Sequence, residues 1–188
     1  MNNRIDLLDF IQKDIEPFLS AEIGVFRGEF SEQILRAMPQ TDLVMVDLWK
    51  HQKEDVYRDS SNLTNYKFKK AKAECEKRVS IFNTGKTFVQ EDSAKASSRF
   101  ANSSFDFIYI DGNHSYDGTK ADIEAWYPKL RRGGYFAGHD YDNYIGTTTT
   151  VQTKTAVLEF ARKNKIKVLT SGDIYPFTPS WYFKKGLK

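Results

Sequence analysis

Residues 18–28 decide the architecture of this chain, and they read FLSAEIGVFRG. Phe18–Ile23 is a short apolar run that predicts a buried strand, and Gly24 and Gly28 predict a turn directly after it. From Phe30 onward the apolar residues recur at helical spacing. The stretch therefore predicts a strand, a glycine turn and a helix in immediate succession, which is the unit of a parallel sheet.

The same alternation continues along the chain. Apolar runs that predict further strands lie at residues 43–46, 86–90, 105–110, 135–137, 166–169 and 181–183. Gly133 and Gly134 are expected to introduce the fifth of the seven strands, and helices are expected at 66–80 and 151–164 among others. Most of these runs are continuous rather than alternating, which indicates strands that are covered on both faces.

No helix separates the last two predicted strands. A short connection cannot make a parallel crossover, so the final strand should run antiparallel to its neighbour. We therefore expect an α/β fold with a Rossmann-like, doubly wound, mostly parallel seven-stranded sheet. Its last strand should be antiparallel, and helices should cover both faces.

Residues 1–188 are expected to form a single domain, because no repeat or low-complexity linker interrupts them. Residues 50–65 are polar and irregular, which indicates a loop or a lid over the site. Forty per cent of the residues are hydrophobic and the formal net charge is +3. This composition speaks against disorder, and the charge is too small to indicate a nucleic-acid partner. With one cysteine and no apolar stretch of membrane-spanning length, the sequence predicts a soluble, cytoplasmic protein without a membrane partner.

Acidic residues follow the predicted strands at the edge where open α/β sheets bind ligands. Asp47 ends the second strand about 20 residues after the glycine turn, where an acid can bind both hydroxyls of an adenosine ribose. The segment from Ala21 to Gly28 resembles the first motif of the class I S-adenosylmethionine-dependent methyltransferases. That resemblance implies S-adenosylmethionine as the cofactor. It also implies a set of cofactor-binding residues: Glu22, Gly24, Gly28, Asp47, Asp92, Ser93 and Asp111.

Each of these features alone also has an ordinary structural explanation. A strand, a glycine turn and a helix can simply pack together. Asp92 and Ser93 could cap the N-terminus of a helix. Asp111 could bind the methionine end of the cofactor or cap the helix that follows it.

The most distinctive local sequence is Asp-Gly-Asn-His-Ser-Tyr at residues 111–116, directly after the fourth strand. Together with Gly133-Gly134 and His139-Asp140, it closely resembles a bacterial and phage methyltransferase group with the pattern DGxHxY…GG…HD. That group is related to metal-dependent O-methyltransferases. The resemblance implies that Asp111, His139 and Asp140 hold a divalent cation, Mg²⁺ or Mn²⁺. It also implies that Asp111 and His114 are catalytic.

His114 is expected to take the proton of the substrate hydroxyl, because a histidine is well suited to proton transfer near neutral pH. It could instead be a metal ligand. A mixed set of histidine and aspartate could also hold Mn²⁺ or Fe²⁺ as readily as Mg²⁺, which prefers oxygen ligands only.

The sequence therefore predicts an enzyme that moves a methyl group from S-adenosylmethionine to a hydroxyl of a small molecule, such as a sugar or another hydroxylated metabolite. Metal assistance and a homodimer are both left open. The alternative is a catalytically inactive cofactor-binding or assembly module with the same fold. A nicotinamide-dependent oxidoreductase is disfavoured, because it needs a tighter Gly-x-Gly-x-x-Gly turn than the one between Gly24 and Gly28.

Overall fold

The computed structural model describes residues 2–53, 55, 57, 59–146, 149–172 and 178–186. The helices are α1 (Arg4–Ile15), α2 (Glu29–Ala37), α3 (Asn65–Val79), α4 (Ser93–Ala96), α5 (Tyr116–Trp126) and α6 (Thr153–Asn164), with 3-10 turns η1 (Ser97–Arg99) and η2 (Tyr127–Lys129). The strands are β1 (Leu19–Ile23), β2 (Asp42–Asp47), β3 (Lys86–Gln90), β4 (Phe105–Ile110), β5 (Leu130–Gly138), β6 (Tyr144–Ile145), β7 (Thr150–Val151), β8 (Leu169–Thr170) and β9 (Trp181–Lys184).

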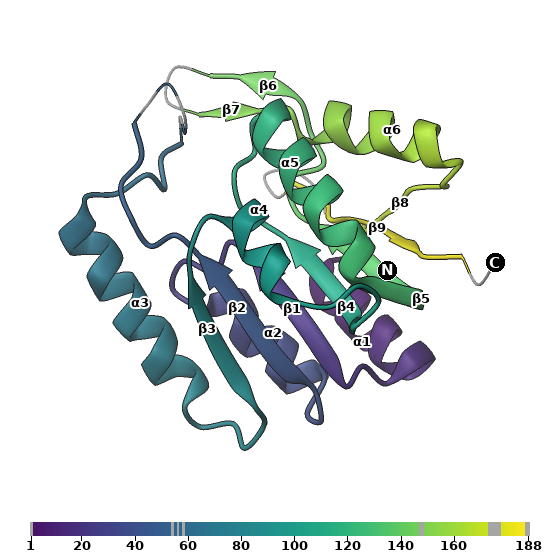
Figure 1. Ribbon diagram of the computed structural model, residues 1–188, viewed down its shortest axis with the longest axis horizontal. Coiled ribbons are helices and arrows are strands. Elements are labelled where there is room, and N and C mark those ends of the chain that lie inside the picture. Colours follow the sequence, from purple (N-terminus) through teal and green to yellow (C-terminus); the bar gives the residue numbers. More distant parts are fainter. Residues whose placement is uncertain are drawn as a thin grey trace.

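Seven of these strands form one sheet in the order β3-β2-β1-β4-β5-β9-β8 (Figure 1). The pairs from β3 to β5 are parallel, whereas β9 runs antiparallel to both β5 and β8. The predicted fold class and the predicted antiparallel last strand are therefore confirmed. The order turns back at β1 and β4, and an open α/β sheet binds its ligands at such a switch point.

Helices cover both faces of the sheet and create two separate cores (Figure 1). On one face, α1, α2 and α3 pack against the sheet through residues such as Leu8, Ile34 and Phe68. On the other face, α4, α5 and α6 pack through residues such as Trp126 and Val157. Because each central strand contributes side chains to both cores, its sequence is continuously apolar.

The register of the parallel strands brings their carboxyl ends to one edge. Ile23 of β1 pairs with Val46 of β2 and with Ile110 of β4, and Ile110 pairs with Gly138 of β5. The residues that follow these pairs therefore leave the sheet side by side, although they are far apart in the sequence. The polar residues singled out by the sequence are among them.

The structure corrects the predicted start of the fifth strand. β5 begins at Leu130, so Gly133 and Gly134 lie inside the strand rather than before it. Gly133 has a φ of 77°, and a Cβ on Gly134 would lie 2.6 Å from the carbonyl oxygen of Asp106. The register between β4 and β5 shifts at this place. The two glycines therefore mark an irregularity within the ladder, which glycine tolerates because it has no side chain.

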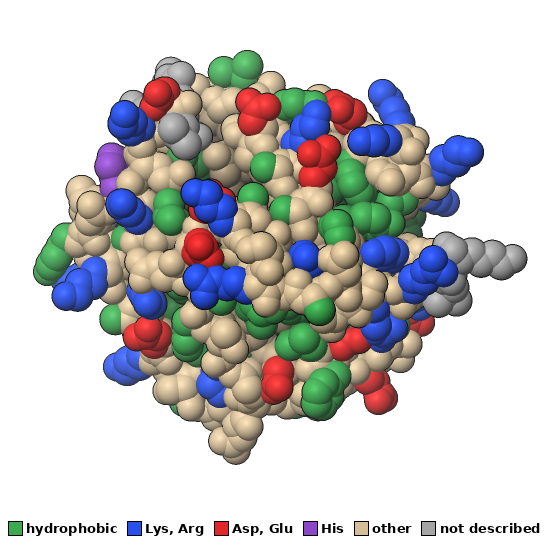
Figure 2. All heavy atoms as spheres, viewed as in Figure 1, with side chains coloured by type: hydrophobic (Ala, Val, Ile, Leu, Met, Phe, Trp, Pro, Cys, Tyr) green, Lys and Arg blue, Asp and Glu red, His purple; other side chains and the backbone are tan. Residues whose placement is uncertain are grey.

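Smaller differences lie near the end of the chain. The predicted strand 166–169 shortens to β8 at the sheet edge, and the predicted helix 151–164 begins only at Thr153. Val151 belongs instead to a β6–β7 hairpin that the sequence did not predict. Within the described residues, no helix is both long and apolar enough to span a membrane. On the face seen in Figure 2, acidic side chains lie among the basic ones.

Candidate active site

The glycine turn after β1 fits closely under the neighbouring strand. Gly24 has a φ of 87°, and a Cβ there would lie 2.1 Å from the carbonyl oxygen of Asp111. Gly28 has a φ of 73°, and a Cβ there would lie 2.6 Å from Sγ of Cys75. Both positions combine a left-handed backbone with no room for a side chain, so glycine is required for the packing itself.

The carboxylate of Asp47 holds this turn in place. Its Oδ2 accepts hydrogen bonds from the backbone N–H groups of Val25 at 2.9 Å and Phe26 at 2.8 Å. Its Oδ1 accepts from the backbone N–H of Trp49 at 2.6 Å. The predicted ribose-binding acid therefore also fixes the loop on which a cofactor would lie. Oδ1 accepts only one of these hydrogen bonds, so it retains a second lone pair with which to accept from a ligand hydroxyl.

A first cavity of about 210 Å³ opens at the ends of β1, β2, β3 and β4. It brings together five of the predicted cofactor residues, namely Gly24, Asp47, Asp92, Ser93 and Asp111. Gly28 is not in its lining, and the side chain of Glu22 faces elsewhere. Glu22 is buried and accepts a hydrogen bond from the hydroxyl of Ser31, and burial raises its pKa well above the usual range.

Asp92 and Ser93 lie where the chain passes from β3 into α4. The side chain of Asp92 accepts a hydrogen bond from the backbone N–H of Lys95 at 3.1 Å, so it caps α4 while it also lines the cavity. Ser93 donates its hydroxyl proton to Asp122 of α5. Its carbonyl oxygen accepts from the indole N–H of Trp126 at 3.0 Å. Asp122 and Trp126, which lie one turn apart on α5, therefore both form hydrogen bonds with the first residue of α4.

Asp122 of α5 also belongs to this site, and the sequence did not single it out. Its side chain is buried beneath the first cavity and is 2% exposed as a residue. Burial raises the pKa of this carboxyl to about 7, although the hydrogen bond from Ser93 opposes the shift. Asp122 therefore holds Ser93 in place at the first cavity, and its carboxyl can change its charge near neutral pH.

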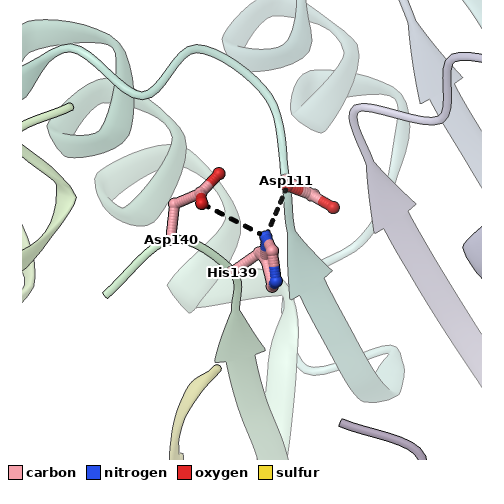
Figure 3. Close-up of side chains that lie close together, drawn as sticks. All are labelled: Asp111, His139 and Asp140. Carbon is pink, nitrogen blue, oxygen red and sulfur yellow. Dashed lines mark ion pairs between the residues drawn. The ribbon is translucent and has the colours of Figure 1, made fainter. Parts of the chain in front are cut away.

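Asp111, His139 and Asp140 come together where β4 and β5 end (Figure 3). Nδ1 of His139 lies 3.8 Å from Oδ1 of Asp111 and 3.4 Å from Oδ1 of Asp140. One ligand atom from each residue lies within 4.8 Å of the others. Neighbouring side chains alternate on a strand, but Asp140 has a φ of 50°, which turns the chain at the strand end. This turn lets consecutive residues face one site.

His114 lies between three carboxylates. Its Nε2 is 3.1 Å from Asp140 and 3.4 Å from Asp111, and its Nδ1 is 3.6 Å from Asp59. Burial alone would lower the pKa of His114, but contacts with Asp111 and Asp59 and the charge of Asp140 raise it to about 10. The imidazole is therefore a cation at neutral pH in this arrangement.

Asp140 and His139 belong to the same cluster, and their pKa values shift as well. Burial opposes the shift, yet the contact with His139 and the charge of His114 lower the pKa of Asp140. The pKa of His139 is raised by Asp140 and Asp111 against the effect of burial. The predicted metal residues and the predicted base thus form one electrostatic cluster.

A second cavity of about 390 Å³ adjoins the first, and Asp111 lines both. Its lining includes His114 and Asp140, together with Tyr57 and Asp59 from the predicted lid segment. The backbone N–H of Ser60 donates to Oγ1 of Thr149 at 3.3 Å, which joins this segment to the β6–β7 hairpin. Glu54, Val56 and Arg58 of the predicted lid lie outside the described residues.

Two residues of the second cavity were missed by the sequence analysis. Asp59 lies in an irregular segment without a motif, and nothing in its local sequence marks it. Arg4 lies on α1, which precedes the first strand and carries no pattern of a binding site. Both reach the site only because the chain folds them onto the strand ends, so tertiary structure was needed to find them.

Comparisons with known proteins bear on the family and the fold of the chain. A sequence profile described as a methyltransferase domain matches residues 21–141. Among curated proteins, none matches the chain by sequence.

Solved structures resemble the fold over nearly the whole chain. A protein from Staphylococcus aureus, provisionally assigned as a caffeoyl-CoA O-methyltransferase, is 10% identical with a TM-score of 0.68, over 96% of this chain and 82% of its own. The O-methyltransferase NovP is 17% identical with a TM-score of 0.59, over 97% and 79%. The methyltransferase PaMTH1 of Podospora anserina, bound to SAH, is 12% identical with a TM-score of 0.63, over 97% and 77%.

Proposed function

Because the chain belongs to the methyltransferase domain family and has the fold of the class I S-adenosylmethionine-dependent enzymes, we propose that it methylates a hydroxyl oxygen of a small molecule. S-adenosylmethionine occupies the first cavity, and the hydroxylated acceptor, a sugar or another metabolite, occupies the second. The observation that carries this proposal is the position of Asp111, which lines both cavities. A methyl donor and its acceptor must meet at such a point.

The reaction itself places few demands on the protein. The acceptor oxygen forms a bond to the methyl carbon while the bond from that carbon to sulfur breaks. The electron pair of the broken bond neutralises the sulfonium, and the hydroxyl proton must pass to a base. The protein therefore has to align two molecules and receive one proton, and alignment alone supplies a large part of such a rate enhancement.

His114 is the proposed proton acceptor, because its ring lines the acceptor cavity within reach of Asp111 and Asp140. The three surrounding carboxylates hold a proton on the ring. His114 can therefore accept a second proton from the substrate only after that first proton has left. A positive charge that binds to Asp111 and Asp140 weakens their attraction for this proton and so lowers the pKa of His114.

The donor set of Asp111, His139 and Asp140 fits a divalent cation, since it offers two carboxylates and one imidazole within 4.8 Å of one another. When bound, such a cation would polarise the acceptor hydroxyl and lower its pKa. His139 and Asp140 would hold it from the end of β5, and Asp111 from the end of β4. The contact of His114 with the same carboxylates would then be weakened.

The experiment is a two-step assay on the purified protein. Calorimetry with S-adenosylmethionine, S-adenosylhomocysteine and NAD measures which cofactor binds, and we expect the first two to bind and NAD not to. A panel of hydroxylated small molecules is then incubated with methyl-labelled S-adenosylmethionine, and labelled product is sought. Binding without transfer to any acceptor, including after addition of Mg²⁺ or Mn²⁺, would favour the alternative of an inactive cofactor-binding module.

A further inference from the structure

Arg4 belongs to the lining of the second cavity. Arg4 is the first residue of α1 and is partly buried. Its Cζ stands over the ring of Phe30, 4.8 Å from the ring centroid. A guanidinium that stacks on an aromatic ring keeps its N–H donors available at the edge, because stacking uses only the face of the group.

The charge of Arg4 acts on the buried carboxyl of Glu22, but Glu22 and Glu29 both have other contact partners. Glu22 accepts from Ser31. Glu29 lies 4.0 Å from Arg78. Within the described part of the chain, the guanidinium of Arg4 makes neither a hydrogen bond nor an ion pair. A partly buried cation with unused donors in a cavity is a recognition element, because burial of a charge is costly without a partner.

The amides at the start of α1 do not provide this site. The side chain of Asn3 accepts hydrogen bonds from the backbone N–H groups of Ile5 at 2.8 Å and Asp6 at 3.0 Å. The donors that Arg4 offers to the cavity are those of its side chain. A planar guanidinium matches a carboxylate or phosphate with two parallel hydrogen bonds.

We propose that Arg4 binds an anionic group of the methyl acceptor, so that the acceptor is a small hydroxy acid. The inference rests on the proposed function, because it concerns the molecule that receives the methyl group. The hydroxyl of the acceptor faces Asp111 and His114, and its carboxylate or phosphate faces Arg4.

The charge distribution of the cavity supports this orientation. Asp59, Asp111 and Asp140 surround His114 and repel an anion. Arg4, whose charge is permanent, lines the same cavity and attracts one. A molecule with a hydroxyl and an anion is therefore bound in one direction, with the hydroxyl toward the carboxylates. Phe30 also lines the cavity and adds an apolar residue to it. The volume of about 390 Å³ suits a small molecule.

The test compares small hydroxylated anions with uncharged relatives. Calorimetry measures binding of 3,4-dihydroxybenzoate and of its methyl ester, and of glycerate and glycerol 3-phosphate against methyl glycerate, to the protein loaded with S-adenosylhomocysteine. We expect at least one acid to bind roughly 10–100-fold more tightly than its ester, which is the effect of a charge-assisted hydrogen bond. The comparison of glycerate with glycerol 3-phosphate distinguishes a carboxylate site from a phosphate site.

Two variants then assign the effect to Arg4. Arg4→Ala should remove the preference for the acid and leave binding of the ester unchanged, and Arg4→Lys should retain part of it. Lys13→Ala, which removes an exposed cation of the same helix, should behave like the wild type. All variants should bind S-adenosylhomocysteine equally, which shows that they are folded.

The inference is overturned if no acid binds better than its ester, or if Arg4→Ala weakens both by the same factor. These results are independent of the proposed function, since they need no turnover. Conversely, a retained preference for acids without methyl transfer to any of them would leave the Arg4 site intact and contradict the O-methyltransferase activity.

Discussion

Nε2 of His114 lies 3.1 Å from Oδ2 of Asp140, so the proposed base and one proposed metal ligand are direct partners. The carboxylates around this ring raise the pKa of His114 to about 10. As a cation, the ring neutralises the acids that would otherwise repel one another. Because His114 and Asp140 are in direct contact, His114 could act either as the base or as a metal ligand. The sequence alone did not distinguish these two roles.

The first prediction concerns His114. Replacement by alanine should reduce turnover by roughly 10²–10⁴-fold, the usual contribution of a general base. The rate of the wild type should rise with pH as the ring loses its proton, and this limb should be absent from the variant. Initial rates over a range of pH measure both effects. His51→Ala, which changes an exposed histidine, is the matched control. Normal turnover with an unaltered pH profile in His114→Ala would remove the residue from the mechanism.

A second prediction concerns the cation. Asp140→Asn replaces a charged ligand with a neutral one, so Mn²⁺ affinity measured by calorimetry should fall by at least 10-fold, on the order of 1.4 kcal/mol. A chelator should lower the activity of the wild type, and Mn²⁺ or Mg²⁺ should restore it. Asp142→Asn changes an exposed acid two residues further on and should bind the ion normally. Full turnover in a metal-free sample would assign Asp111, His139 and Asp140 to substrate binding or to structure.

Asp47 provides a third prediction. Asp47→Ala should weaken S-adenosylmethionine binding by about 1–3 kcal/mol, because ligand hydroxyls and the N–H groups of the turn both lose an acceptor. Asp47→Asn keeps the volume and one acceptor oxygen, so the loss should be smaller. Thermal unfolding of both variants in the absence of ligand separates damage to the turn from loss of the ribose contact. If affinity is unchanged in a folded variant, Asp47 does not bind the ribose.

The fourth prediction concerns Asp122 and stability. Its pKa is raised by burial from 3.8 to about 7. Between these values the native carboxyl holds a proton that the unfolded chain has lost. The contribution of Asp122 to stability is therefore present below about pH 4 and is lost as the pH rises to about 7. Urea unfolding at several pH values should show this fall in the wild type.

Asp122→Asn cannot ionise, so its free energy of unfolding should lack that part of the pH dependence, a few kcal/mol at most. The control is Asp117→Asn on the exposed side of the same helix. The groups whose charges act on Asp122 are Asp92 and His114. The interpretation is wrong if the wild type and Asp122→Asn show the same slope of stability against pH.

The local sequence was sufficient to predict most strands of the sheet. Lys86–Gln90 and Phe105–Ile110 have the predicted bounds, because their apolar runs are bounded by polar or turn-forming residues. The candidate residues at the strand ends also lie together, since the carboxyl edge of a parallel sheet is a consequence of topology alone. The two glycines of β5 were misplaced because a glycine pair looks the same before a strand and at an irregularity within it.

Long-range contacts explain the remaining gaps. The positions of Asp59 and Arg4 depend on how a polar segment and a helix fold over the sheet edge, and neither carries a periodic signal of that placement. The hairpin of Tyr144–Ile145 and Thr150–Val151 has only two residues in each strand. Such short strands lie below what hydrophobic alternation can reveal.

The position of β9 has a consequence for the order in which the protein can assemble during synthesis. Among the described strands, β9 comes after β8 in the chain, yet it lies between β5 and β8 in the sheet. The ribosome therefore releases β8 before β9, the described strand with which it pairs, has been made. β1 to β5 can pair with one another as they emerge from the ribosome. The backbone N–H and C=O groups of β8 stay unpaired until β9 has been made. Until β9 pairs with it, the edge of β5 is open to incorrect pairing.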